Sequence, residues 1–120
     1  MLFSASASAQ YAFPIEGEFS GKGEGELSLR TIVLDNEKGI VAASAFTGIT
    51  GGCSGTIAGI GKYTAGTLKF TNYTKEEGTD NCTVTIVFDK SSKNGRMSES
   101  NCSEFHGPGC AFDGKIKMKR

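Results

Sequence analysis

The residues most able to do chemistry in this 120-residue chain gather in one short segment near its C-terminus. The single histidine, His106, stands midway between Cys102 and Cys110 and is followed by Gly107-Pro108-Gly109. An imidazole changes its charge near neutral pH, so it can serve as a general base, a metal ligand or a switchable hydrogen-bond donor. Which of these chemistries applies depends on the residues around it.

Catalysis by His106 lacks the partners that it needs. A serine nucleophile in a Gly-x-Ser-x-Gly turn does not occur, and oxidation of the cysteines removes the thiolates that a cysteine nucleophile requires. No pair among the many carboxylates is singled out for glycoside hydrolysis, and the glycine-rich residues 21–25 lack the spacing of a phosphate loop. Zinc is disfavoured because there is no Cys-x-x-Cys pair. The sequence therefore predicts no enzyme, no metal and no cofactor.

Four cysteines form an even set, which is typical of proteins oxidised outside the cytosol. They are Cys53, Cys82, Cys102 and Cys110, and three pairings are open. Cys53 and Cys82 each begin a run of alternating apolar residues, which favours a bridge between neighbouring strands. We therefore expect Cys53–Cys82 and Cys102–Cys110, the second closing a short ring that removes about 2–3 kcal/mol of chain entropy from the unfolded state.

A ring closed around His106 is suited to binding. Phe105 supplies an aromatic anchor beside the switchable imidazole, with Glu104 at the rim, and a rigid loop loses less entropy when it meets a partner. The predicted partner-binding residues are therefore Glu104, Phe105 and His106. The alternative is a staple, in which Phe105 turns inward and plugs the end of the domain while His106 bonds locally.

The rest of the chain has the two-residue period of β-strands with one buried face. Turn signals separate the runs, including Gly59 with Gly61 and the hairpin pair Asn94-Gly95. Alanines within residues 40–46 also allow a short helix there. The expected fold is all-β, a single antiparallel meander of about eight short strands forming a small barrel or sandwich. The strand candidates are residues 15–21, 27–34, 40–46, 55–60, 66–73, 82–88, 95–99 and 111–118.

Charge and hydropathy exclude several classes of partner. Thirteen Lys plus Arg balance thirteen Asp plus Glu, so no global field attracts nucleic acid. No apolar stretch approaches the roughly 18 residues that span a bilayer. Residues 1–9 resemble the end of a secretory signal, with a disordered tail as the alternative, and residues 10–120 form one β domain. These features predict a secreted or periplasmic protein.

The segment 102–114 reads CSEFHGPGCAFDG. It resembles the ending of small bacterial secreted or periplasmic domains, and residues 52–55 and 82–88 resemble them more loosely. It is also similar in design to periplasmic inhibitors of vertebrate-type lysozyme, whose short disulfide-closed loop carries a protruding histidine that engages the catalytic carboxylates. Related inhibitors are small eight-stranded barrels. The resemblance implies a lysozyme or another muramidase as the partner protein.

The expected function is thus non-catalytic binding of a protein through the loop between Cys102 and Cys110. Two other functions stay open. One is a barrel that binds a small molecule or glycan through the aromatic residues Tyr63, Phe70 and Tyr73. The other is a purely structural role in the cell envelope.

Overall fold

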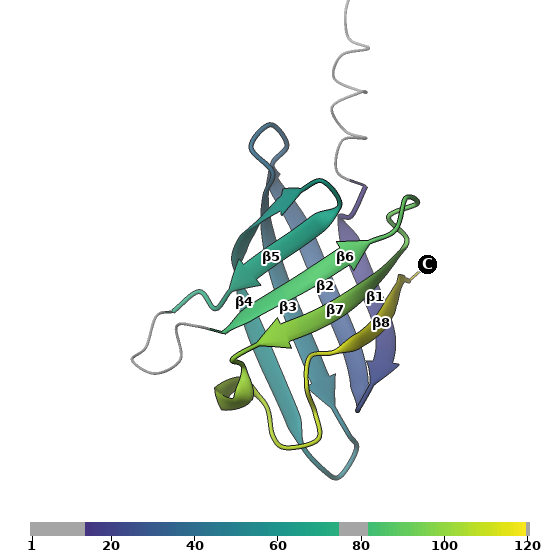
Figure 1. Cartoon of the computed structure of the whole chain (residues 1–120), viewed down its shortest axis with the longest axis vertical. Coiled ribbons are helices and arrows are strands. Elements are labelled where there is room, and N and C mark those ends of the chain that lie inside the picture. The colour runs from purple at the N-terminus through teal and green to yellow at the C-terminus, as the bar shows by residue number, and fades with distance from the viewer. Residues whose placement is uncertain (1–13, 75–81, 120) are drawn as a thin grey trace, which may run out of the picture.

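The computed structural model describes residues 14–74 and 82–119, so the predicted signal remnant at residues 1–9 lies outside the described residues. Eight antiparallel strands form a closed barrel in which each strand pairs with the next and β8 pairs with β1 (Figure 1). The predicted all-β meander is confirmed, and it closes as a barrel. The strands are β1 (Gly17–Gly23), β2 (Glu26–Asp35), β3 (Ile40–Gly48), β4 (Ser54–Thr64), β5 (Thr67–Thr71), β6 (Thr83–Phe88), β7 (Asn94–Ser100) and β8 (Gly114–Met118).

Apolar side chains fill the barrel interior. Alternation along each strand sends one set inward, as in β6, where Val84 and Ile86 are fully buried while Val87 between Ile86 and Phe88 faces solvent. The three largest fully buried side chains are Phe19, Phe70 and Phe112. Strands β1–β4 form the back of the barrel in Figure 1, and strands β5–β8 form the front. Within the described residues, no helix is long and apolar enough to cross a membrane.

Residues 40–46 form part of β3, which confirms the strand predicted there, and the short helix that their alanines also allow does not form. One turn prediction, within β4, is wrong. Gly59 and Gly61, expected at a turn, lie inside β4, and the turn follows at Ala65 and Gly66. These glycines instead allow neighbouring backbone to approach β4 closely, because a Cβ atom on Gly59 would lie 1.7 Å from the carbonyl oxygen of Thr71.

The hairpin between β6 and β7 turns earlier than expected. Asn94 and Gly95 already belong to β7, and the positive φ of 63° falls on Ser92. The Asp89 carboxylate determines this placement, since it accepts hydrogen bonds from the backbone N–H of Ser91 and from the side chains of Ser91 and Asn94. Such side-chain caps compete with the preference of Asn-Gly for the turn.

The wall of the barrel is incomplete beside the first half of β4. β4 has eleven residues, but its ladder with β5 covers only Gly61–Thr64. Residues 54–60 meet isolated contacts on that side: the N–H of Tyr73 donates to the carbonyl of Ala58 at 2.7 Å, and His106 forms an antiparallel bridge with Gly55. The segment after β7 therefore completes the wall.

We expect Gly59→Ala to destabilise the barrel by about 1–3 kcal/mol, because the added methyl forces β4 away from Thr71. Gly52→Ala is the matched control, since its Cβ meets neighbours at 3.5 Å or more. Urea unfolding followed by circular dichroism measures both. Equal stability of the two variants would contradict the close approach.

Candidate functional site

The predicted binding residues lie in the segment between β7 and β8, residues 101–113, which crosses one end of the barrel. We call this segment the closing loop. Asn101, with φ of 61°, turns the chain out of β7 into a short 3-10 turn, η1 (Ser103–Phe105). The N–H of Phe105 donates to the carbonyl of Cys102 at 2.8 Å within this turn. A second turn follows, where the N–H of Cys110 donates to Gly107 at 3.2 Å.

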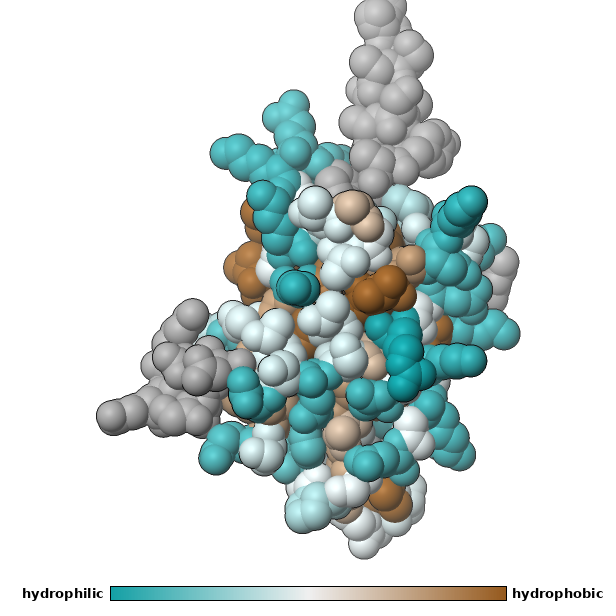
Figure 2. All heavy atoms as spheres, in the orientation of Figure 1, coloured by the Kyte–Doolittle hydropathy of each residue, from teal (hydrophilic) through white to brown (hydrophobic). Residues whose placement is uncertain are grey.

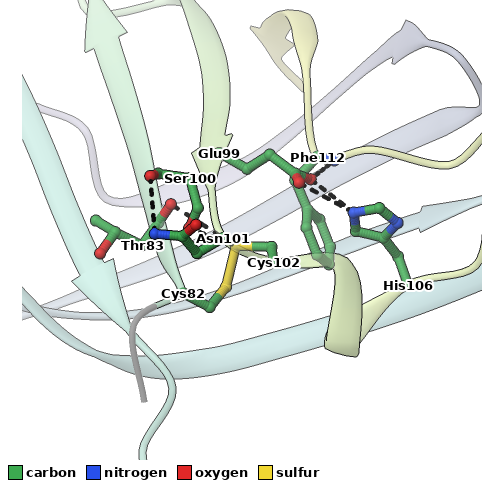
Figure 3. Close-up of a disulfide and its surroundings, with 8 residues drawn as sticks. All are labelled: Cys82, Thr83, Glu99, Ser100, Asn101, Cys102, His106 and Phe112. Atoms are coloured by element: carbon green, nitrogen blue, oxygen red, sulfur yellow. Dashed lines mark hydrogen bonds and ion pairs between the residues drawn. A yellow bond between two sulfur atoms is a disulfide. The ribbon is translucent and has the colours of Figure 1, made fainter. Parts of the chain in front are cut away.

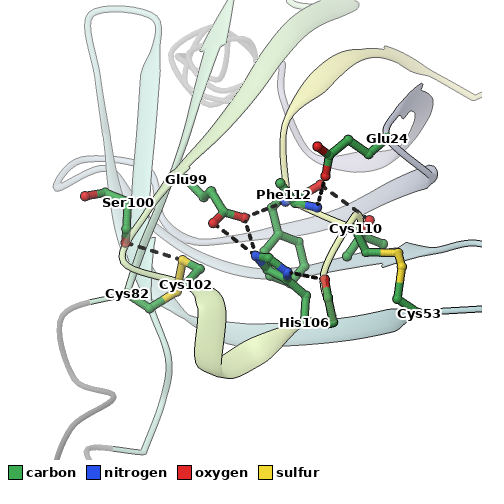
Figure 4. A network of polar contacts seen from close by, with 12 residues as sticks. Glu24, Cys53, Cys82, Glu99, Ser100, Cys102, His106, Cys110 and Phe112 are labelled. Atoms are coloured by element: carbon green, nitrogen blue, oxygen red, sulfur yellow. Dashed lines mark hydrogen bonds and ion pairs between the residues drawn. A yellow bond between two sulfur atoms is a disulfide. The ribbon is translucent and has the colours of Figure 1, made fainter.

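The disulfides differ from the expected pairing. Cys53 bonds to Cys110, and Cys82 bonds to Cys102, so the predicted bridges Cys53–Cys82 and Cys102–Cys110 are wrong (Figures 3 and 4). The closing loop is thus not a ring of its own. It is tied at its start to β6 and at its end to the turn before β4. Two disulfides are typical of a protein that folds in an oxidising compartment.

Strand pairing explains both bridges. Thr83 of β6 pairs with Ser100 of β7, so the residues just beyond this pair, Cys82 and Cys102, meet at the same end of the hairpin. The two cysteines lie symmetrically about Ser92 in the sequence, and this symmetry was a usable signal. Cys53 precedes β4 and reaches the closing loop through the bridge between Gly55 and His106, which brings Cys110 within reach. That contact is not local, so strand patterns did not indicate it.

The side chain of His106 points into the molecule, where it is 10% exposed. Its Nε2 lies 2.9 Å from one carboxylate oxygen of Glu99 on β7 and 3.1 Å from the other (Figure 4). Its Nδ1 lies 2.8 Å from the carbonyl oxygen of Gly107. The ring also packs edge-on against Phe112, with centroids 5.4 Å apart. Both ring nitrogens are therefore occupied.

This environment favours the imidazolium form of His106. A carbonyl oxygen and a carboxylate only accept hydrogen bonds, so both ring nitrogens must donate. Burial lowers the pKa of His106, but the Gly107 carbonyl, Glu99 and the more distant charge of Glu24 together outweigh burial and raise this pKa above its ordinary value. Glu99 also accepts the N–H of Phe112 at 2.6 Å, so it ties β7 to both arms of the closing loop.

The three predicted binding residues do not form one displayed tip. Phe105 is partly buried and packs against the core, and His106 faces Glu99. Glu104 is exposed. The inward direction of Phe105 and His106 matches the staple described as the alternative for this loop.

Neighbouring turns join the closing loop in one surface. Glu24, in the turn between β1 and β2, accepts the N–H of Ala111 at 2.8 Å, and the Cys53 disulfide attaches the turn between β3 and β4. Ile49 in that second turn is 43% exposed. We call this surface the loop end. Sequence reasoning missed Glu24, Glu99 and Ile49, because only the folded barrel brings these turns together.

The aromatics of the small-molecule alternative do not line a common site. Phe70 is buried in the core, and Tyr63 packs edge-on against Phe88 with ring centroids 6.1 Å apart. Tyr73 is 75% exposed on the outside. Among the described residues, Phe70 thus packs inside the barrel while Tyr73 lies on its outer surface.

The ion pair predicts how stability depends on pH. The folded pKa of His106 is raised above the ordinary value of 6.5, so its stabilising contribution is complete below pH 6.5 and is lost as pH rises through the folded pKa. Glu99→Gln should abolish this loss of stability at higher pH. Glu104→Gln, which changes an exposed carboxylate in the closing loop, should retain it. Urea unfolding across pH 5.5–9 with each variant provides the measurement. A wild-type curve that rises with pH over this window contradicts the assignment.

Removing the two disulfides should have unequal effects. The chain-entropy relation gives about 4 kcal/mol for the separation of 57 residues in Cys53–Cys110 and about 3 kcal/mol for the 20 residues in Cys82–Cys102. Paired serine variants, Cys53→Ser with Cys110→Ser and Cys82→Ser with Cys102→Ser, should follow this order in denaturant unfolding. Peptide mapping without reduction checks the connectivity, and a fragment joining Cys102 to Cys110 would refute it.

Similarity to known proteins adds no constraint on the function of this barrel. The chain matches no protein-family model, no curated protein and no solved structure. Its function therefore has to follow from the geometry of the barrel, the closing loop and the surfaces that they expose.

Proposed function

We propose that this chain is a non-catalytic binding domain of a secreted or periplasmic protein, and that its loop end contacts a partner protein. The observation that carries the proposal is the multiple fixation of the closing loop. Two disulfides hold its ends, and the contacts of His106 with Glu99 and Gly55 hold its middle. A surface fixed in this way loses little conformational entropy on binding.

The side chains available to a partner are those that the loop end leaves exposed. Glu104 and Pro108 project from the closing loop, and Ile49 stands in the adjoining turn. An exposed apolar side chain in one turn and a carboxylate in another supply an anchor and a charged rim, which suits a partner carrying both an apolar pocket and a basic group. Phe105 and His106 act as positioning residues beneath this surface.

A catalytic role has little support in the same region. All four cysteines are in disulfides, and both nitrogens of His106 act as donors in its buried contacts. The imidazole is thus engaged in holding the loop. A muramidase is the partner class to test first because residues 102–114 resemble the ending of small bacterial secreted or periplasmic domains, some of which are attached to lysozyme-inhibitor-like sequences. The proposal does not rest on the closed ring and protruding histidine of inhibitor loops, since Cys102 and Cys110 pair with other cysteines and His106 faces Glu99.

Inhibition assays test this proposal directly. The oxidised full chain is mixed with c-, g- and i-type lysozymes, and clearance of a bacterial cell-wall suspension is followed by turbidity. We expect micromolar inhibition of at least one type. Ile49→Asp and Glu104→Arg should each weaken it about tenfold, the effect of losing one good interface contact.

Lys62→Gln, on the outer face of β4 away from the loop end, is the control and should inhibit like the unchanged chain. Circular dichroism confirms that each variant is folded. If no lysozyme type is inhibited at micromolar excess, the muramidase proposal is wrong. If inhibition survives both loop-end substitutions, the loop end is not the binding surface.

A further inference from the structure

A row of cations crosses the outer face of the barrel wall beside the loop end, where Arg96 pairs with Asp113 of the closing loop. Lys115 on β8 lies directly opposite Lys22 on β1 and directly opposite Arg96 on β7. Neighbouring strands are only about 4.8 Å apart, and like charges placed opposite each other destabilise a sheet. The opposed cations at Lys22, Lys115 and Arg96 therefore do not contribute to the stability of the barrel.

Acidic neighbours compensate only part of this charge. Lys22 lies 3.6 Å from Glu26, and Arg96 lies 2.9 Å from Asp113. Lys115 is exposed at the centre of the row, and Lys117 follows it on the same face of β8; neither has an ion pair with a described residue within 4 Å. The middle of the row therefore carries uncompensated positive charge.

The same row ends on an apolar side chain. Val87 on β6 is directly opposite Arg96, so Val87, Arg96, Lys115 and Lys22 follow one another across four strands. Val87 is 54% exposed. Figure 2 shows an apolar spot in the middle of this face, beside strongly hydrophilic side chains.

A depression of about 720 Å³ lies beside three members of this row, Val87, Arg96 and Lys115, while Lys22 lies beyond its edge. Val87, Arg96, Lys115 and Lys117 line it on the outer face, and the buried Phe88 and Ile116 also contribute. The depression has the size of sites for small organic ligands, which typically measure about 300–1,000 Å³. It offers a cationic half and an apolar half to one molecule.

Asp89 places a negative charge at one end of the depression. It lines the depression near Asn94, which pairs with Lys117. Hydrogen bonds from Ser91, then from Asn94, lower the pKa of Asp89, so it stays negative. An anion is thus repelled from the Asp89 end and attracted to Lys115, where Lys22 and Arg96 add positive charge.

We propose that this depression binds a small anionic amphiphile, a free molecule with one carboxylate, sulfonate or phosphate group on an apolar body. The anionic group contacts Lys115 between Lys22 and Arg96. The apolar body lies over Val87. This site adjoins the loop end, because Lys22, Arg96 and Lys115 line a second hollow together with Glu24 and Ala111. It goes beyond the proposed loop-end contact, since it uses exposed strand residues and neither Glu104 nor Ile49.

A pair of dyes that differ in charge tests the proposal. 8-Anilinonaphthalene-1-sulfonate has an anionic group on an aromatic body, and N-phenyl-1-naphthylamine has the same rings without it. Fluorescence titration of the full chain should show binding of the sulfonate about tenfold tighter than that of the neutral dye, the expected value of one charge-assisted contact. Added salt should weaken only the sulfonate.

Three variants separate the two halves of the site. Lys115→Gln should weaken the sulfonate about tenfold and leave the neutral dye unchanged, and its melting temperature should not fall because the substitution relieves repulsion. Val87→Ser should weaken both dyes. Lys62→Gln is the matched control, because Lys62 also faces a lysine, Lys69, across a strand pair but lies outside the depression.

Equal affinity for the two dyes, or an unchanged sulfonate affinity in Lys115→Gln, would overturn the proposal. Sedimentation with vesicles of phosphatidylglycerol and phosphatidylcholine provides the second test. We expect the chain to stay in the supernatant. Sedimentation that Lys115→Gln abolishes would assign this face to an anionic membrane surface and would overturn binding of a free molecule.

Discussion

The structure depends on how the barrel closes beside β4. This strand extends well beyond its ladder with β5, which leaves the backbone of residues 54–60 to be covered by other segments. The closing loop covers the far end through the bridge between His106 and Gly55, where a side chain on Gly55 would collide with the Phe105 carbonyl. Backbone polar groups at a buried edge need partners, and an uncovered strand edge invites wrong pairing. Both disulfides and the ion pair of His106 with Glu99 serve this one task of holding the loop against the barrel.

This constraint separates the parts of the molecule that hold the fold from those that are free to bind. His106, Glu99 and Phe112 form a buried contact group whose charges compensate each other. Because that group fixes the loop from below, exposed neighbours such as Glu104 and Ile49 are held in place for a partner. On the wall, by contrast, Lys115 lies opposite Lys22 and Arg96, and the proposed anionic ligand would compensate part of their charge. The two surfaces adjoin, since Arg96 pairs with Asp113 of the closing loop, but they offer different exposed side chains to a partner.

The strands could be predicted from the sequence because local alternation determines them. The disulfide pairing and the direction of His106 could not, because they depend on residues far apart in the chain. All eight strands were found because burial of one face imposes a two-residue period. Turn positions were predicted less accurately. Hydrogen bonds to the Asp89 carboxylate place the β6–β7 turn earlier than Asn94-Gly95, and the close approach of Thr71 places Gly59 within β4 and not in a turn. The disulfide pairing was wrong because it depends on contacts across the barrel, although the symmetry of Cys82 and Cys102 about the β6–β7 turn carried part of the answer. The direction of His106 depends on Glu99 and Gly55, and the cationic row depends on the register of β8 with two strands. Neither is visible in a linear pattern.

The central claim is that His106 is a partly buried, doubly donating imidazolium that holds the closing loop to the barrel. Nuclear magnetic resonance of the imidazole ring tests it most directly, because the chain has a single histidine and its ring signals need no assignment among others. The structure predicts a pKa above 6.5 and protons on both ring nitrogens that exchange slowly with water at pH 6.5. It also predicts that this pKa falls in Glu99→Gln. A ring that titrates at or below 6.5 with rapidly exchanging protons, unchanged by Glu99→Gln, would show a displayed histidine and contradict the account.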